Sequence, residues 1–187
     1  MKERGIIFSA PMVLALLAGR KTVTRRMSKQ WDSLVVGQRL WVRETFARED
    51  LGPDEYNRLV WRADRCARLI DSPTSWSEIE YLPSDYEPKR WTPAIHMPRW
   101  ASRTLLEVTE PVRVERAQDI TDADVLREGL PRHLCNDARG CDTSYACDLL
   151  VDRFADLWRQ LHTKPGQRWE DNPAVRRVAF KVLEVKR

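Results

Sequence analysis

Basic and hydroxyl side chains crowd together in residues 20–26. Lys21 stands among arginines in this segment. Neighbouring positive charge disfavours an ammonium, so the Lys21 amine is a candidate nucleophile or general base. The hydroxyl of Thr24 follows three residues later and is close enough in sequence to be activated by that amine. The alternative is that the cations of this segment only hold a phosphate group.

A carboxylate that suits proton transfer ends a short predicted helix over residues 120–129. Thr121 is its expected N-cap, Asp124 follows three residues on, and Gly129 is expected to end the helix. Glu128 therefore lies in the last turn, where the negative end of the helix dipole disfavours a carboxylate charge. This position favours a general acid or base. The alternative is that Glu128 simply pairs with an arginine.

A second group of candidate residues follows an alternating segment, residues 40–46, which predicts a strand. Trp41 and Arg43 share one face of that strand, and an aromatic ring beside a guanidinium can stack a nucleobase. Trp41 could equally be a core residue. His96 is either a substrate contact or a structural hydrogen-bonding residue. The candidate substrate-binding residues are Arg20, Arg26, Trp41, Arg43, Glu44, His96 and Arg103.

The order of predicted elements indicates the fold class. Further predicted elements are a strand over residues 5–8, an apolar core helix over 10–18, a long β-rich run over 103–116, an amphipathic helix over 147–162 and a closing strand over 175–185. In the β-rich run, the expected core residues are Leu105, Val108, Val112 and Val114. The pattern does not alternate strand and helix. It predicts an α+β fold, a small and mostly antiparallel β-barrel with a few flanking helices.

Length and composition exclude several classes of protein. A chain of 187 residues fits one domain over residues 1–187, with insertions at about 47–93 and 130–145. The longest apolar stretch, residues 12–18, is too short to cross a membrane. Four cysteines do not make a disulfide scaffold, which predicts a cytoplasmic protein. The sequence has no glycine-rich phosphate loop and no dinucleotide fingerprint, so we expect no cofactor.

Charge is distributed unevenly along the chain. Residues 1–48 hold ten Lys and Arg against three Asp and Glu, and residues 172–187 hold five against one. If these two basic stretches meet in the fold, they form one positive face that suits a phosphate-bearing partner. The alternative is an ordinary solvated surface.

One histidine and three cysteines lie close together in sequence and are candidate metal ligands: His133, Cys135, Cys141 and Cys147. The three cysteines are spaced C-x5-C-x5-C, which is wider than the usual spacing of structural zinc ligands. Free thiols in a polar loop are the prediction, and no metal site is expected. A zinc-stapled loop remains the alternative.

Several segments, in the same order, resemble the ASCH domain family. Residues 17–26 resemble its G-x-K-T-x-T-x-R signature, and residues 37–44 resemble its following G-D-x-L-W-V-R-E strand. Residues 123–129 resemble its short central helix, and residues 178–182 resemble its closing strand. Residues 95–103 are similar to a subgroup found in phages and prophages. These pieces span nearly the whole chain.

The resemblance implies a fold, a substrate class and a catalytic set. The fold would be a PUA-like β-barrel that binds RNA. In the amidohydrolase branch of the family, a Lys, a Thr and a Glu hydrolyse N(4)-acetylcytidine, and they match Lys21, Thr24 and Glu128. The chain departs from that branch by its two insertions. The alternatives are a non-catalytic RNA-binding module, an RNA-cleaving member, and a phage accessory factor that binds a host protein through residues 47–93.

Overall fold

The computed structural model describes most of the chain, in two compact units. The described residues are 3–50, 57–72, 75–76, 80–83, 86–131 and 150–186. The first unit comprises Met1–Leu17, Gln38–Glu107 and Val182–Arg187, and the second comprises Ala18–Gly37 and Val108–Lys181. The strands are mostly antiparallel and the helices few, which confirms the predicted α+β class. The single domain over residues 1–187 stays a prediction.

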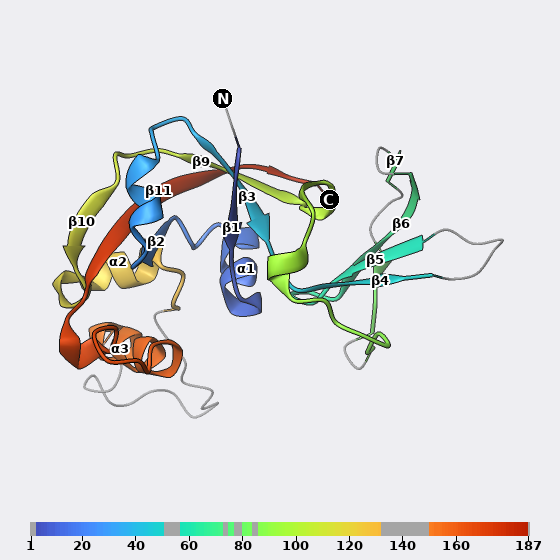
Figure 1. Ribbon diagram of the computed structural model, residues 1–187. Helices are drawn as coiled ribbons and strands as arrows, with labels where there is room; N and C mark the ends of the chain where they lie inside the picture. Colours follow the sequence, from blue (N-terminus) through green and yellow to red (C-terminus); the bar gives the residue numbers. More distant parts are fainter. Residues whose placement is uncertain are drawn as a thin grey trace. The chain divides into compact units, whose positions relative to one another are not determined.

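In the first unit, three strands position the candidate residues Trp41 and Arg43. β1 (Arg4–Ile7) runs parallel to β3 (Arg39–Arg43), and β3 runs antiparallel to β9 (Thr104–Val108) (Figure 1). The register places Gly5 opposite Trp41. Alternate residues point inward and are buried, namely Ile6, Leu40, Val42 and Leu106. This alternation is the reason that neighbouring polar residues on β3 face the other way.

Helix α1 (Ala10–Leu17) follows β1 and is apolar for almost its whole length. Its first turn closes where the Val13 amide donates to the Ser9 carbonyl at 2.9 Å. The chain leaves the helix through Gly19, whose φ of +70° is a left-handed conformation that glycine adopts without strain. The sequence predicted a helix buried nearly all round. That prediction is wrong in part, because Leu14 is 42% exposed.

The second sheet of the first unit occupies the predicted insertion. β4 (Phe46–Glu49), β5 (Asn57–Trp61) and β6 (Cys66–Ser72) are antiparallel neighbours, and the short β7 (Ser75–Trp76) and β8 (Glu80–Tyr81) both pair with β6. The sequence predicted an insertion over this region but not the sheet that it forms. One face packs Phe46, Leu59, Trp61, Cys66, Met97 and Ala101 together, and the other packs Ala47, Val60 and Ala67 under Leu82, Tyr86 and Trp91.

Two short 3-10 helices, Ala94–His96 and Arg99–Ala101, lead from this sheet into β9. Each ends with a backbone hydrogen bond, from Met97 to Ala94 at 3.1 Å and from Ser102 to Arg99 at 3.2 Å. The Ser102 hydroxyl then donates to the Val42 carbonyl at 2.7 Å. These bonds fix the chain beside β3.

In the second unit, a long strand organises the sheet. β2 (Val23–Arg26) and β10 (Arg113–Arg116) both run antiparallel to β11 (Ala174–Val185). The predicted β-rich run over residues 103–116 is divided into β9 and β10, with Pro111 between them. Val114 was predicted to be a core residue, and this is wrong, because it is 61% exposed. Its strand is the last in the strand order and has no buried face.

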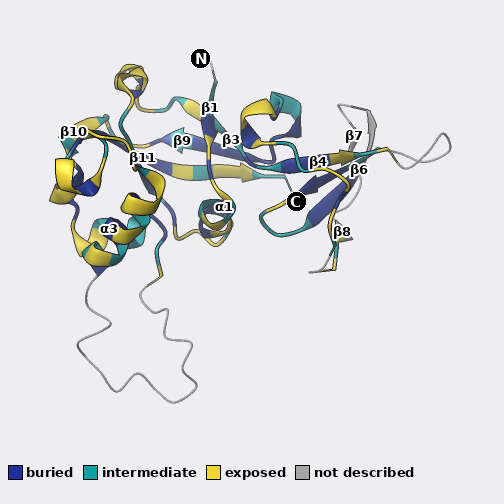
Figure 2. Ribbon diagram, turned by 60° about the horizontal axis from the view of Figure 1, so that its bottom comes forward, coloured by how far each residue is buried: buried dark blue, intermediate teal, exposed yellow. Residues whose placement is uncertain are grey.

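Two helices complete the second unit. α2 (Asp122–Arg127) begins as predicted, with the Thr121 hydroxyl accepting from the Asp124 amide at 3.3 Å. α3 (Leu150–Leu161) carries both buried and exposed residues (Figure 2). It packs Phe154 and Trp158 against Trp169, whereas Leu161 at its end is 56% exposed. The remaining 3-10 helices are Lys29–Ser33, Ala117–Asp119 and Trp169–Asp171. No helix among the described residues has the length and apolar character needed to span a membrane.

Candidate functional site

Lys21 lies in the interior of the second unit, in the turn between α1 and β2. Its side chain is closed off from solvent. The Nζ atom donates to the Glu128 Oε2 atom at 2.7 Å, to the Glu128 carbonyl at 2.8 Å and to the Val23 carbonyl at 2.9 Å. The turn is held beside α2 by two further bonds: the Thr22 amide donates to the Arg127 carbonyl and the Arg20 guanidinium to the Gly129 carbonyl, both at 2.8 Å.

The surroundings of Lys21 lower the pKa of its ammonium. Burial is the largest cause, because an ammonium loses its hydration in the interior. Glu128 opposes this shift by direct charge attraction and hydrogen bonding, while Arg25 and Arg26 add to it by repulsion. The crowding effect that the sequence predicted is therefore present, but desolvation is the stronger of the two.

The Glu128 carboxylate is held by a different cation on each oxygen. Oε2 accepts from Lys21, and Oε1 accepts from the Arg25 Nη1 atom at 3.2 Å. Arg25 is itself fixed, because Nε binds Glu115 at 2.7 Å and Nη2 binds Asp124 at 2.8 Å. The Glu128 side chain is 4% exposed and that of Arg25 is 1% exposed. Lys21 on one oxygen and Arg25 on the other therefore fix the orientation of the Glu128 carboxylate.

The basic stretches near both chain ends do meet, but they do not expose their charges there. β2 and β11 place Arg25 opposite Arg177. Arg177 binds Glu110 at 2.9 Å and Asp124 at 3.5 Å, and Arg176 binds Asp32 at 2.7 Å. These guanidiniums are matched by carboxylates, so this part of the sheet is an ion-pair network and not the open positive face that the sequence suggested.

Thr24 and Arg26 lie on the face of β2 opposite to Arg25, since side chains alternate along a strand. Thr24 is buried and pairs with Val178 of β11. Within the described residues, no hydrogen bond joins its hydroxyl to Lys21 or Glu128. Arg26 is half-buried, and burial lowers the pKa of its guanidinium while the Glu128 charge opposes that shift.

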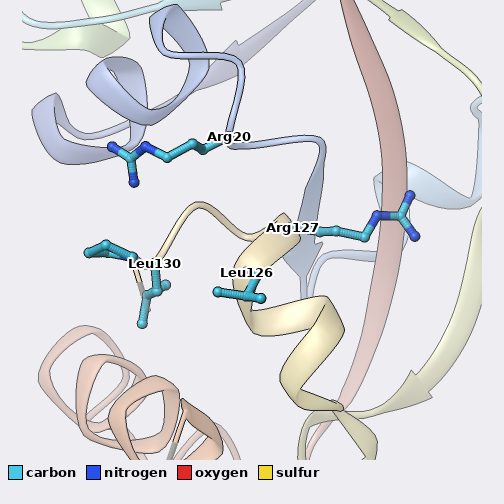
Figure 3. Close-up of a pocket in the computed structure, with 5 residues that line it drawn as sticks. Arg20, Leu126, Arg127 and Leu130 are labelled. Carbon is cyan, nitrogen blue, oxygen red and sulfur yellow. The ribbon is translucent and has the colours of Figure 1, made fainter. Parts of the chain in front are cut away.

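A pocket of about 310 Å³ opens next to this pair, a volume at the lower end of those that hold small ligands. It is lined by Arg20, Leu126, Arg127, Leu130 and Pro131. Figure 3 shows the Arg20 guanidinium extending over Leu130, whereas the Arg127 guanidinium points away from them. Arg20 and Arg127 are the chain neighbours of Lys21 and Glu128, which do not themselves line the pocket.

In the first unit, Trp41 and Arg43 share a face as predicted. The Arg43 guanidinium carbon is 5.0 Å from the centroid of the Trp41 ring. Arg43 also donates to the carbonyls of Ile95 and Met97, the latter at 3.4 Å. Gly5 makes room for both side chains, because an added Cβ would lie 3.0 Å from Arg43 Cδ and from a Trp41 ring carbon. Trp41 is half-buried and packs against the cluster that contains Phe46 and Trp61, so it is in part a core residue.

Glu44 and Arg103, both predicted substrate contacts, bind each other in the interior of the first unit. Arg103 donates to the two Glu44 oxygens at 2.9 and 3.0 Å and to the two Asp64 oxygens at 2.8 and 2.9 Å. Its guanidinium carbon is also 4.8 Å from the Trp61 ring centroid. The charges of Glu44 and Arg103 are therefore paired with each other in the interior, where they do not face a substrate. His96, by contrast, is exposed at the end of its 3-10 helix.

Several site residues were not singled out from the sequence: Arg25, Asp64, Glu115 and Asp124. Asp124 had a usable signal, because it precedes Glu128 by four residues and such residues share one side of a helix. Asp64 had no such signal, since its pairing with Arg103 joins residues that are 39 positions apart.

The predicted absence of a metal site concerned His133, Cys135, Cys141 and Cys147, which lie outside the described residues. Among the residues that are described, no three His, Cys, Asp or Glu side chains are grouped so as to hold a metal ion.

Comparison with known proteins does not identify a family for this chain. No family model matches the sequence, and no curated protein matches it. One solved structure, protein EF3133 from Enterococcus faecalis V583, assigned to the family model DUF984, is similar over 100% of this chain and 78% of its own. The identity is 9% and the TM-score 0.47, a likeness too weak to carry an argument.

Proposed function

We propose that the protein is an ASCH-like member with a PUA-like barrel, cytoplasmic and of the phage or prophage type, that acts on RNA or modified nucleosides. Its reaction would be hydrolysis of the amide of N(4)-acylated cytidine. The observation that supports this most is the desolvated 2.7 Å contact between Lys21 Nζ and Glu128 Oε2. The contact joins the two segments in which the resemblance puts the catalytic Lys and Glu.

This contact provides a base and an acid in one proton transfer. Moving a proton from Nζ to Oε2 converts the ion pair into a neutral amine and a carboxylic acid. Burial away from bulk solvent favours the neutral pair over the charged one, and the lowered pKa of Lys21 has the same cause. Arg25 donates to Oε1 at 3.2 Å and so holds the Glu128 carboxyl group in place for the transfer.

Hydrolysis then follows with atoms in balance. The Lys21 amine takes a proton from the attacking water as its oxygen bonds to the acyl carbon. Glu128 gives its proton to N4 of cytosine as the C–N bond breaks. The products are a carboxylic acid and cytidine, and the pair returns to ammonium and carboxylate. Thr24 would donate to the acyl oxygen, where negative charge develops, and the pocket beside Arg20 would hold the base. Because Lys21, Glu128 and Thr24 are buried and do not line that pocket, substrate binding would have to open the segments around Arg20 and Arg127.

The experiment is chromatography of N(4)-acetylcytidine after incubation with wild type and three variants. Lys21→Ala and Glu128→Gln should each lose about 100-fold or more in rate, a loss typical of acid–base groups. Glu115→Gln is the matched control, because Glu115 also binds Arg25 but does not touch Lys21; it should stay within about threefold of wild type. Absence of turnover by wild type with acetyl, propionyl and benzoyl substrates would overturn hydrolysis, as would an active Glu128→Gln.

A second candidate is a non-catalytic RNA-binding module. One observation favours it: Lys21 Nζ has an acceptor for each of its three N–H donors, two of them backbone carbonyls. In this second reading, the role of Lys21 is structural: its hydrogen bonds join β2 to the end of α2. In that case Glu128→Gln would leave RNA binding unchanged or stronger, since it removes a negative charge.

A further inference from the structure

Two arginines lie over the ring of Trp91 in the first unit, and two exposed cations, Lys89 and Arg90, precede that tryptophan in the chain. Trp91 packs against the sheet formed by β4, β5 and β6. The guanidinium carbons of Arg62 and Arg65 lie 5.7 and 6.0 Å from the centroid of its ring. Both arginines belong to the turn between β5 and β6. Two regions of the chain that are nearly 30 residues apart therefore form one surface.

Glu87 fixes this arrangement. Its Oε1 atom accepts from Arg65 at 2.8 Å, and its Oε2 atom accepts from the Trp91 indole N–H at 2.7 Å. The charges of Arg65 and Arg62 help to lower the pKa of the Glu87 carboxyl, with the hydrogen bond from Trp91 as the largest cause. The carboxylate thus orients the ring and one guanidinium together, so the surface does not have to order itself when a partner arrives.

Positive charge exceeds negative charge on this surface. Arg62, Lys89 and Arg90 are exposed, and within the part of the chain that the structure describes none of them has a carboxylate at ion-pair distance. Arg62 lies over the Trp91 ring, with its guanidinium carbon 5.7 Å from the ring centroid, and a cation–π contact of this kind does not use the N–H donors. These donors remain able to bind a phosphate in the bidentate geometry that guanidinium favours.

The turn carries backbone strain at the residue that supplies one of the cations. Arg65 has φ +56°, a left-handed conformation that side chains other than glycine and asparagine rarely adopt. The contacts with Glu87 and Trp91 hold the arginine there. Strain of this kind persists where the surrounding structure over-determines it, often at functional positions.

We propose that Arg62, Arg65, Lys89 and Arg90 around Trp91, here called the Trp91 patch, bind the phosphate backbone of an RNA strand. Guanidinium groups stacked on an aromatic ring and flanked by further cations suit repeating phosphates with planar bases between them. The patch lies in the insertion that the compact amidohydrolases lack. The inference rests on RNA as partner in the proposed function, but not on catalysis.

The test is fluorescence anisotropy of a labelled single-stranded RNA of twelve nucleotides at several salt concentrations. The variant Arg62→Gln/Arg90→Gln should weaken binding about tenfold at 50 mM salt and reduce the salt slope by roughly 1.4, for two lost contacts. The matched control removes two equally exposed cations elsewhere, Arg113→Gln/Lys164→Gln, and should change binding less than about twofold. Thermal unfolding of both variants checks that the fold is kept.

A variant of opposite sign sharpens the test. Glu87→Gln removes the carboxylate of the patch while leaving an oxygen that can accept from Trp91, so RNA affinity should rise about twofold or more. Equal affinity and equal salt slope in wild type and Arg62→Gln/Arg90→Gln would overturn the proposal. So would wild type that binds anionic vesicles of phosphatidylserine but not the RNA.

The two proposals fail in distinguishable ways. If hydrolysis of free N(4)-acetylcytidine is seen in wild type and is unchanged in Arg62→Gln/Arg90→Gln while RNA binding falls, both hold. If wild type does not hydrolyse the nucleoside but binds RNA through the patch, hydrolysis alone fails. If turnover is present and the patch variant binds RNA as wild type does, the patch alone fails.

Discussion

Lys21 and Glu128, which are 107 residues apart in sequence, are in direct contact at 2.7 Å with both side chains closed to solvent. A buried ion pair gains little net stability over an apolar pair of the same shape, because both charges lose their hydration. The proposed hydrolysis would use the mobile proton of this pair, whereas a purely structural pair would affect stability alone.

Removing both members of the pair should cost less than the sum of the two single removals. Lys21→Met takes the ammonium away from the Glu128 carboxylate, and Glu128→Leu leaves the buried Lys21 ammonium without its carboxylate, so each should lower the free energy of unfolding by about 3 kcal/mol. The double variant should cost about 1 to 3 kcal/mol less than their sum. Urea unfolding measures all three. The exposed pair Arg159 and Glu170, at 2.6 Å, is the control and should show little or no coupling, because solvent screens both charges. Additive losses at Lys21 and Glu128 would contradict strong coupling.

Arg25 should not be replaceable by lysine. One guanidinium binds Glu115, Asp124 and Glu128 through three different nitrogens, and a single ammonium on a flexible stem cannot reproduce that fork. We expect Arg25→Lys to lower the free energy of unfolding by about 3 kcal/mol. A thermal unfolding midpoint within about 2 °C of wild type would show that lysine suffices.

Arg103 should behave in the same way in the first unit. It donates to four carboxylate oxygens of Glu44 and Asp64 and is 3% exposed, so Arg103→Lys should cost about 3 to 5 kcal/mol. Arg99→Lys is the control, because its pair with Glu3 at 2.5 Å is partly exposed and should change stability by about 1 kcal/mol or less. Equal effects of the two substitutions in denaturant unfolding would refute the importance of burial here.

The Cys66 thiol should make stability fall in alkali. Burial, with the Asp64 charge adding to it, raises the pKa of Cys66 from 9.0 to about 11. Between these values the unfolded chain releases its thiol proton while the folded chain keeps it. The folded state then binds more protons, and stability decreases as pH rises, by about 2 to 3 kcal/mol over the window. Urea midpoints at pH 8 and pH 10.5 should therefore differ more in wild type than in Cys66→Ala. Identical pH dependence in the two proteins would contradict a raised pKa.

The elements that the sequence predicted well are those with local signals. The two ends of α2, at Thr121 and Gly129, could be predicted because helix capping depends on only a few neighbouring residues. The shared face of Trp41 and Arg43 follows from strand alternation alone. The ASCH resemblance put Lys21 and Glu128 in one catalytic set, which stays a prediction, and nothing local in the sequence requires the contact that joins them.

The elements that were missed depend on contacts between distant residues. Glu44 and Arg103 have the composition of a surface site, and only the fold shows that they are 2.9 Å apart in the interior. Val114 has the side chain of a core residue, but its strand has no buried face. The sheet over β4 to β8 was missed because its strands are short and their pairing is set across loops. The charge counts wrongly suggested an open positive face for a related reason. Arg25 and Arg177 form ion pairs with carboxylates that lie far away in sequence.

The measurement that tests the central claim most directly is the pH profile of kcat/KM for wild type with N(4)-acetylcytidine. If Lys21 and Glu128 share one catalytic proton, the profile is bell-shaped, because activity is lost when the pair takes up a second proton and when it releases the shared one. The alkaline limb should fall below 10.5, the ordinary lysine value, because burial lowers the pKa of Lys21, and Glu128→Gln should abolish the bell. A profile that is flat across this range, or a wild type without turnover, would contradict the account.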